Sequence, residues 1–97
     1  MDEFACFTLS PGCIVEQDIN YLGSMMVELY AVPVATQQAC ADLAASIDGA
    51  LLWSFSTLNN KCFGRTSDAG RTHQSGVVSG NIQCASMIVY LNYQFDA

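Results

Sequence analysis

The sequence predicts an α+β domain in which an antiparallel β-sheet carries one helix packed across it. Three observations lead to this fold class: a single helical pattern at 36–49, several short β-prone segments, and five cysteines spread over 97 residues. A chain of this length forms one domain with a small core. We therefore expect a single domain over 1–97, with its core at about 6–84 and a C-terminal strand at 85–96.

Two strands are predicted before the helix. FACFTL (4–9) is apolar and β-prone, and the Ser-Pro-Gly sequence at 10–12 ends it. MMVELYAV (25–32) also has the pattern of a strand, and Pro33 stands at its end. Alternate residues of this second strand are expected to share one face: Met25, Val27, Leu29 and Ala31.

The helix is predicted from TQQACADLAASIDG (36–49). Thr36 can cap its N-terminus, and the Ala- and Leu-rich body has high helix propensity. Gly49 supplies the left-handed residue that commonly ends a helix. Apolar side chains recur at helical spacing at Ala39, Leu43 and Ile47. We expect a helix at about 36–48 with one apolar face lying on the sheet.

A hairpin follows the helix. ALLWSFST (50–57) and KCF (61–63) flank Leu58-Asn59-Asn60, where the asparagine pair suits a tight turn. Trp53 and Phe55 share one strand face, and we expect them to pack beneath the helix rather than to form a stacking platform for a ligand. The segment 82–95 alternates with a period of two and predicts a last strand.

The polar segment GRTSDAGRTHQSG (64–76) holds two of the three basic residues and the only histidine. It does not match a phosphate-binding loop, because five residues separate Gly64 from Gly70 and Arg71 stands where the motif needs lysine. We interpret the segment as a long surface loop between strands. A solvated connection and a binding loop are both open interpretations.

Composition excludes several classes of function. The net charge is −6 with three cations in all, which argues against binding to nucleic acid or to an anionic membrane surface. No apolar run approaches the length of about 18 residues that spans a bilayer, and the opening residues carry no secretory signal. With one histidine and no Cys-x-x-Cys pair, a metal site is not expected.

No catalytic arrangement is predicted, and neither is a cofactor. A Cys–His nucleophile would need a free thiol beside His73 and an orienting group, and the sequence offers no credible set. The acidic pairs Asp18 with Glu28 and Asp42 with Asp48 are interpreted as scattered solvated carboxylates. The five cysteines are either small buried thiols or a disulfide framework of a secreted domain.

A first cysteine precedes QDI by about a dozen residues, a helical cysteine stands in ATQQACADLA, and the aromatic strand LLWSFST leads to NNKCF and SGNIQC. The order of these features resembles the PAN/apple domain family, whose members are disulfide-stapled modules of secreted and cell-surface proteins, including adhesive proteins of apicomplexan parasites. The resemblance runs from about Cys6 to Cys84. It implies a curved antiparallel sheet that cradles one helix.

The resemblance also implies the disulfides. Carried over, the family pairs are Cys6–Cys84 and Cys40–Cys62. A third bridge found in many apple domains is missing at both ends, where this chain has Ala44 and, roughly, Leu52. Cys13 has no family partner and is expected to be a free thiol, although it could instead be the cysteine that bridges to Cys84. The length of chain after Cys84 is a second departure from the family.

The function implied by the resemblance is a non-catalytic, extracellular adhesion module that binds carbohydrate, with protein–protein interaction as the alternative. The partner would be a glycan or a surface protein, without nucleic acid or membrane insertion. We expect a secreted or secretory-organelle location within a longer multidomain chain. Donors and acceptors suited to sugar hydroxyls define the candidate ligand-binding residues: Thr66, Asp68, Arg71, Thr72, His73, Gln74 and Tyr90.

Overall fold

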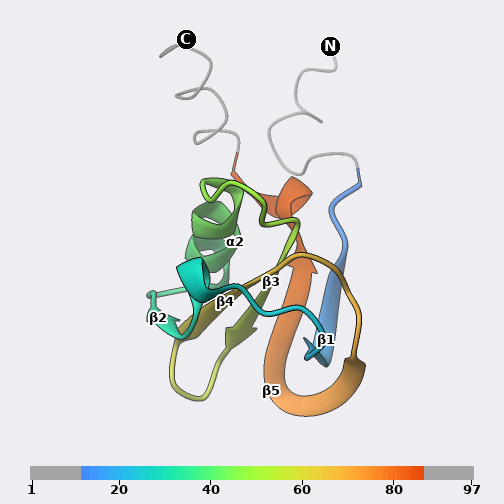
Figure 1. The fold of residues 1–97 in the computed structure, drawn as a ribbon. Coiled ribbons are helices and arrows are strands. Elements are labelled where there is room, and N and C mark those ends of the chain that lie inside the picture. The colour runs from blue at the N-terminus through green and yellow to red at the C-terminus, as the bar shows by residue number, and fades with distance from the viewer. Residues whose placement is uncertain (1–11, 87–97) are drawn as a thin grey trace, which may run out of the picture.

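Five antiparallel strands form one open sheet in the order β1-β5-β3-β4-β2, with a helix packed across it (Figure 1). This computed structural model describes residues 12–86, so the predicted strand at 4–9, Cys6, Tyr90 and most of the predicted strand at 85–96 lie outside the described residues. The α+β fold class is confirmed. The elements are β1 (Val15–Tyr21), the 3-10 helix η1 (Val27–Leu29), β2 (Val32–Pro33), α2 (Gln37–Ala45), β3 (Leu52–Ser56), β4 (Lys61–Arg65), β5 (Arg71–Asn81) and the 3-10 helix η2 (Ile82–Cys84).

Helix α2 begins as the sequence predicts and ends earlier. The Thr36 hydroxyl accepts a hydrogen bond from the backbone N–H of Ala39 at 3.0 Å, which satisfies a donor that the first turn leaves free. At the other end, the Ser46 hydroxyl donates to the carbonyl of Leu43 at 2.7 Å. This local bond competes with helix continuation, so the helix ends at Ala45 and Gly49, at φ +92°, lies in the following turn.

The core lies between α2 and one face of the sheet. Trp53 and Phe55 are buried there, as predicted, and the Trp53 indole N–H donates to the carbonyl of Asn81 at 2.8 Å. A Cβ atom at Gly80 would stand 2.6 Å from the Trp53 ring, so only glycine leaves room for it. The helix contributes small side chains that let it approach the sheet closely: Cys40, Ala41 and Ala44.

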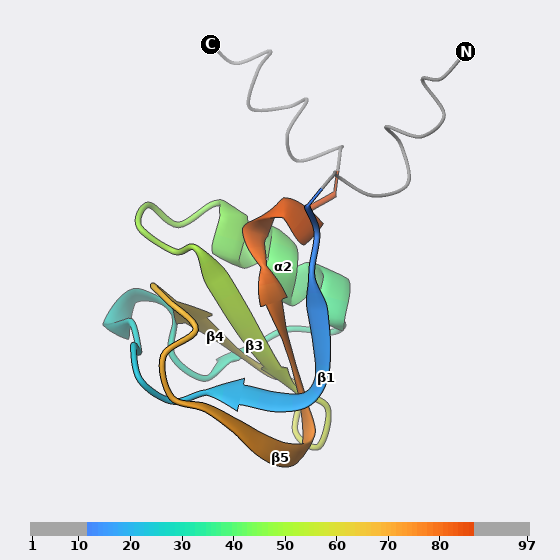
Figure 2. The ribbon, with the colours of Figure 1, turned by 90° about the vertical axis from the view of Figure 1, so that its right-hand side faces the viewer.

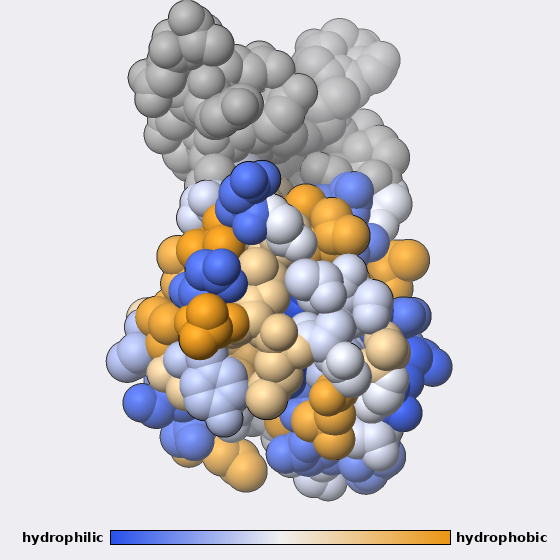
Figure 3. Space-filling model, in the orientation of Figure 1, coloured by the Kyte–Doolittle hydropathy of each residue, from blue (hydrophilic) through white to orange (hydrophobic). Residues whose placement is uncertain are grey.

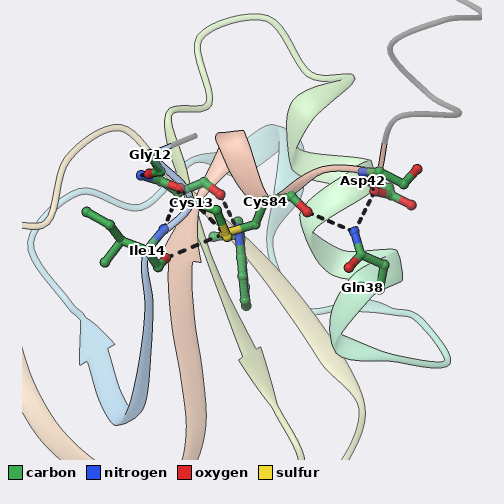
Figure 4. Close-up of a disulfide and its surroundings, with 9 residues drawn as sticks. Gly12, Cys13, Ile14, Gln38, Asp42 and Cys84 are labelled. Atoms are coloured by element: carbon green, nitrogen blue, oxygen red, sulfur yellow. Dashed lines mark hydrogen bonds between the residues drawn. A yellow bond between two sulfur atoms is a disulfide. The ribbon is translucent and has the colours of Figure 1, made fainter. Parts of the chain in front are cut away.

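Two disulfides staple these layers, and one of them corrects the predicted pairing. Cys40–Cys62 joins α2 to β4, as expected. Cys84 pairs with Cys13 rather than with Cys6, so Cys13 is not a free thiol (Figure 4). The physical reason is the strand pairing: β1 aligns Val15 with Gly80 of β5, which brings Cys13 beside η2, with 4.7 Å between the two Cα atoms.

Helix α2 also holds the chain that leaves this disulfide. The Gln38 amide donates to the carbonyl of Cys84 at 2.9 Å, and the Asp42 carboxylate accepts a hydrogen bond from the backbone N–H of Ser86 at 2.7 Å (Figure 4).

The two disulfides close loops of different length. Cys13 and Cys84 are 71 positions apart, and Cys40 and Cys62 are 22 positions apart. In the chain-entropy model, these loops stabilise the fold by about 4 and about 3 kcal/mol, respectively.

The predicted strand at 25–32 is wrong. Its buried side chains are Met26 and Leu29, three residues apart, and the backbone between them forms η1. Val27, expected on the buried face, is 88% exposed. A short helical turn buries residues at a spacing of three, whereas the strand pattern assumed a spacing of two. Only Val32–Pro33 pairs as a strand, against β4.

The predicted loop at 64–76 is also wrong in extent. Gly64 and Arg65 belong to β4, and β5 starts at Arg71, so only 66–70 connects the two strands. The first residues of β5 carry polar side chains on both faces of the strand, so they lack the alternation that marks a half-buried strand. Their strand conformation comes from pairing with β1 more than fifty residues earlier, as in His73 with Ile19.

The disulfide arrangement predicts a specific labelling result. The chain has five cysteines, four of which are paired within residues 12–86. Alkylation of unreduced, denatured protein should therefore label Cys6 alone, as read by peptide mass mapping, and reduction should expose all five. Linked peptides that join Cys6 to Cys84 would contradict this pairing.

Candidate functional site

The end of the β1–β5 ribbon bends over the face of the sheet that α2 leaves uncovered. The bend occurs where the register breaks between Gln17 and Ile19, with Asp18 at φ +58° and Gly76 opposite it at φ +87°. The Asp18 carboxylate accepts the backbone N–H of Gly76 at 2.9 Å. Figure 2 shows both strands turning together at this point. Such a bulge re-aims the strand beyond it.

The covered face is polar. Ser54 of β3 and Ser79 of β5 are fully buried and share a hydrogen bond of 2.6 Å, and the Ser79 hydroxyl also lies 2.7 Å from the carbonyl of Ile19 on the bent strand. Arg65 is 2% exposed and donates from Nη2 to the Asn20 side chain at 2.9 Å. Its guanidinium also stands 5.3 Å from the centre of the Phe63 ring, a cation–π contact.

A pocket of about 270 Å³ lies between this face and the bent ribbon. Its floor comes from the sheet, where register places the lining side chains on one face, and its roof comes from the ribbon end and the 66–70 turn. The volume is slightly below the range of about 300–1,000 Å³ usual for small-molecule sites, so the pocket suits one small ring. The lining residues are Ile14, Glu16, Tyr21, Leu52, Asp68, Arg71 and Asn81.

Glu16 ties the roof of the pocket to its floor. Its Oε1 accepts from the Tyr21 hydroxyl at 2.6 Å and from Nε of Arg71 at 3.2 Å, and its Oε2 forms an ion pair with Nη2 of Arg71. Tyr21 and Arg71 are partners across the β1–β5 ribbon, so one carboxylate holds both strands of the roof. A two-point contact of this kind is among the stronger side-chain pairs.

Asp68 is the pocket carboxylate without a partner among residues 12–86. The side chain makes no hydrogen bond or ion pair there, and it is exposed at the rim. Its charge nevertheless reaches the pocket interior: burial first, and Asp68 second, raise the pKa of the Tyr21 hydroxyl above 10.0. Tyr21 therefore stays a neutral donor over the physiological range of pH, and Asp68 remains available to accept hydrogen bonds from a ligand.

The turn that carries Asp68 is held in place by the segment at 22–24. The Ser24 hydroxyl forms hydrogen bonds with the carbonyl and with the hydroxyl of Ser67. The N–H of Gly23 donates to the carbonyl of Ala69 at 2.8 Å. Gly70, at φ +73°, packs so closely that an added Cβ would lie 2.6 Å from the nitrogen of Gly23. Asp68 is therefore presented from an ordered turn.

The structure brings two of the predicted site residues together. Asp68 and Arg71 line the pocket, whereas Thr66, Thr72, His73 and Gln74 are exposed outside its lining. Gln74 accepts a hydrogen bond from the Asn20 amide at 3.0 Å. Tyr90 lies outside the described residues.

Sequence reasoning missed the residues that form the rest of the pocket. Glu16 and Tyr21 lie on β1, which the sequence did not predict, although Val15, Ile19 and Tyr21 in VEQDINY are β-prone. The alternate set of Val15, Ile19 and Tyr21 is interrupted by the polar residue Gln17, so the strand pattern is weak. Leu52 and Asn81 enter the site through strand register, for which the sequence holds no local signal.

Residues 12–86 contain no group of three or more His, Cys, Asp or Glu side chains that could hold a metal ion. No helix within the same residues is long and apolar enough to cross a membrane.

Substitution of Gly70 tests whether close packing orders the Asp68 turn. Gly70→Ala adds both left-handed backbone strain and a clash, whereas Gly49→Ala adds strain alone, because the nearest atom to its new Cβ is 3.9 Å away. We expect Gly49→Ala to lower the free energy of unfolding by about 1–2 kcal/mol and Gly70→Ala to lower it by clearly more, measured by urea unfolding. Equal losses would contradict the close contact.

Substitution of Arg65 tests the cost of its buried charge. Nε and Nη1 of Arg65 have no hydrogen-bond partner within residues 12–86, and burial lowers the pKa of the guanidinium, opposed in part by Tyr30. Each buried unsatisfied group costs about 1–3 kcal/mol. Arg65→Met keeps an unbranched chain, and Asn20 keeps its bond to the Tyr21 backbone, so we expect an unchanged or higher urea midpoint. Arg65→Ala leaves a cavity and should be destabilised; equal destabilisation of both variants would show that the charge is satisfied.

No protein-family model matches this chain, and no curated protein matches its sequence. What the pocket can bind is therefore inferred from its own side chains.

Proposed function

We propose that this protein is a non-catalytic binding module that holds a sugar ring in the pocket beneath the bent β1–β5 ribbon. The observation that carries the proposal is the composition of the pocket: an acceptor at Asp68 with no partner in the described part of the chain, guanidinium donors at Arg71, and apolar walls at Ile14 and Leu52. Sugars combine hydroxyl groups with apolar ring faces, so they complement mixed surfaces of this kind.

The side chains favour binding over catalysis. Hydrolysis of a glycosidic bond requires two carboxyl groups, one of them as acid and the other as base or nucleophile. Both oxygens of Glu16 are engaged by Arg71 and Tyr21, which leaves Asp68 as the one carboxylate in the pocket free to act. A single exposed carboxylate supports recognition of hydroxyl groups.

Two further features support an extracellular adhesion role. The disulfides Cys13–Cys84 and Cys40–Cys62 are compatible with an oxidising compartment, and the cysteine order resembles the PAN/apple family. A small pocket of about 270 Å³ limits the affinity of one domain. Repeated domains on one longer chain would raise the avidity.

Protein binding is the second candidate function, and the surface of η1 favours it. Val27 is 88% exposed, and Met25 and Tyr30 beside it are each 54% exposed. On the face drawn in Figure 3, however, apolar groups are separated by hydrophilic ones instead of forming one continuous patch. Because a stable protein interface buries about 800 Å² on each partner, we place this candidate second.

The proposal predicts which variants lose glycan binding. Asp68→Asn removes a charged acceptor from an exposed side chain, so binding on a glycan array should fall by about 1.5–3 kcal/mol, or about tenfold or more, while the melting temperature is unchanged. His73→Ala is the matched control, since it lies on β5 outside the pocket lining. Free sugar should compete with the array signal.

Two results would contradict the proposed sugar site or the proposed function. If Asp68→Asn binds every glycan as the parent does, the sugar site lies elsewhere. If no glycan binds and a Val27→Asp variant loses a protein partner, the second candidate function replaces the first.

A further inference from the structure

We infer that the pocket selects uncharged sugars over sugars that carry a carboxylate or sulfate, and that Glu16 is the residue that sets this selectivity. The inference rests on the proposed function of the pocket. It adds the chemical class of the ligand and assigns the choice to one ion pair.

The charges of the pocket lining support the inference. Glu16, Asp68 and Arg71 are the charged side chains among the lining residues, so the site has one more negative than positive charge. The full chain has three cations, and the other two are accounted for: Lys61 lies at the start of β4 opposite Ser56, and Arg65 is buried beneath Asn20. Arg71 is thus the one cation that lines the pocket.

Arg71 is already engaged by the protein. Two of its nitrogens, Nε and Nη2, contact the two oxygens of Glu16, which is the geometry that a carboxylate ligand would need. An acidic sugar must displace a carboxylate that is tethered within the same molecule, and such a competitor has a high effective concentration. The remaining guanidinium N–H groups still suit a neutral hydroxyl.

Glu16 is held firmly enough to resist displacement. Its Oε1 also accepts from the Tyr21 hydroxyl at 2.6 Å, and its backbone lies opposite Ser79 in the regular part of β1, before the bulge. The Glu16 side chain is 21% exposed, against 51% for Arg71. The carboxylate is therefore the fixed member of the pair, and it keeps Arg71 neutralised.

Asp68 opposes an anionic ligand as well. Its carboxylate has no partner within residues 12–86, and its charge acts on Tyr21 inside the pocket. A carboxylate or sulfate on the sugar would meet this charge without a free cation to compensate it. Two neighbouring hydroxyl groups of a neutral sugar can instead donate to Asp68, so the same residue favours one class and repels the other.

The test compares matched sugars on the wild-type chain and on Glu16→Gln. Methyl glucoside with methyl glucuronide, and methyl galactoside with methyl galacturonide, are titrated into ¹⁵N-labelled protein and followed by chemical-shift changes. For the wild type we expect at least one neutral sugar to bind about tenfold or more tightly than its acidic partner. This difference in affinity corresponds to the free energy of one charged hydrogen bond. Glu16→Gln keeps an acceptor for Tyr21 but frees Arg71, so it should gain about tenfold or more for the acidic sugar.

Two controls isolate the ion pair. Glu28→Gln removes an exposed acid on η1 outside the pocket lining and should leave the neutral-to-acidic ratio unchanged. Glu16→Gln combined with Arg71→Gln should lose the gained binding of the acidic sugar. In Glu16→Gln that gained binding should also weaken as salt is raised, because it is a partly exposed charge contact.

The outcomes separate this inference from the function on which it rests. If the wild type binds a neutral sugar and its acidic partner equally, the selectivity is wrong while the sugar site stands. If Glu16→Gln is folded, by its dispersed spectrum, and gains nothing for the acidic sugar, Glu16 does not set the choice. If the wild type binds neither sugar of either pair at tens of millimolar, the proposed function fails and the inference fails with it.

Discussion

The break in the β1–β5 ribbon is the constraint on which the rest of this structure depends. Across the break, β5 has four residues (74–77) where β1 has one, Asp18. Asp18 and Gly76 both take left-handed conformations, and a hydrogen bond of 2.9 Å between them fixes the bend. Without the bend, the ribbon would extend into solvent with both faces exposed. With it, the ribbon end covers the sheet face that α2 does not reach, and a second layer forms on that face.

The two faces of the sheet are consequently held by different forces. The face under α2 is apolar and buries Trp53 and Phe55 against small helical side chains, so the hydrophobic effect stabilises it. The face under the bent ribbon is joined by hydrogen bonds, such as that between Ser54 and Ser79. Polar contacts are directional, which makes this side suited to fixing the positions of groups that surround a pocket, at a small net gain in stability.

Some residues of the candidate site can be selected from the sequence, and others cannot. Asp68 and Arg71 could be selected from the sequence because they are charged residues in a polar, glycine-containing segment. Glu16 and Tyr21 could not, since polar Gln17 weakens the period-two pattern of Val15, Ile19 and Tyr21 in β1. The choice between Cys6 and Cys13 as the partner of Cys84 was open for a similar reason: it depends on the register of β1 against β5.

The sequence by itself determined the α+β class, the capped helix, the Asn59-Asn60 hairpin, the shared buried face of Trp53 and Phe55, and the Cys40–Cys62 bridge that the family resemblance implied. Helices, caps and tight turns depend on contacts within a few residues, and local sequence therefore carries their signal. Only the tertiary structure decided the strands β1 and β5, the Cys13–Cys84 bridge and the pocket. Each of these depends on the pairing of β1 with β5, whose partners lie 50 or more positions apart. Such pairing is selected by the energy of the whole fold, which no short segment contains.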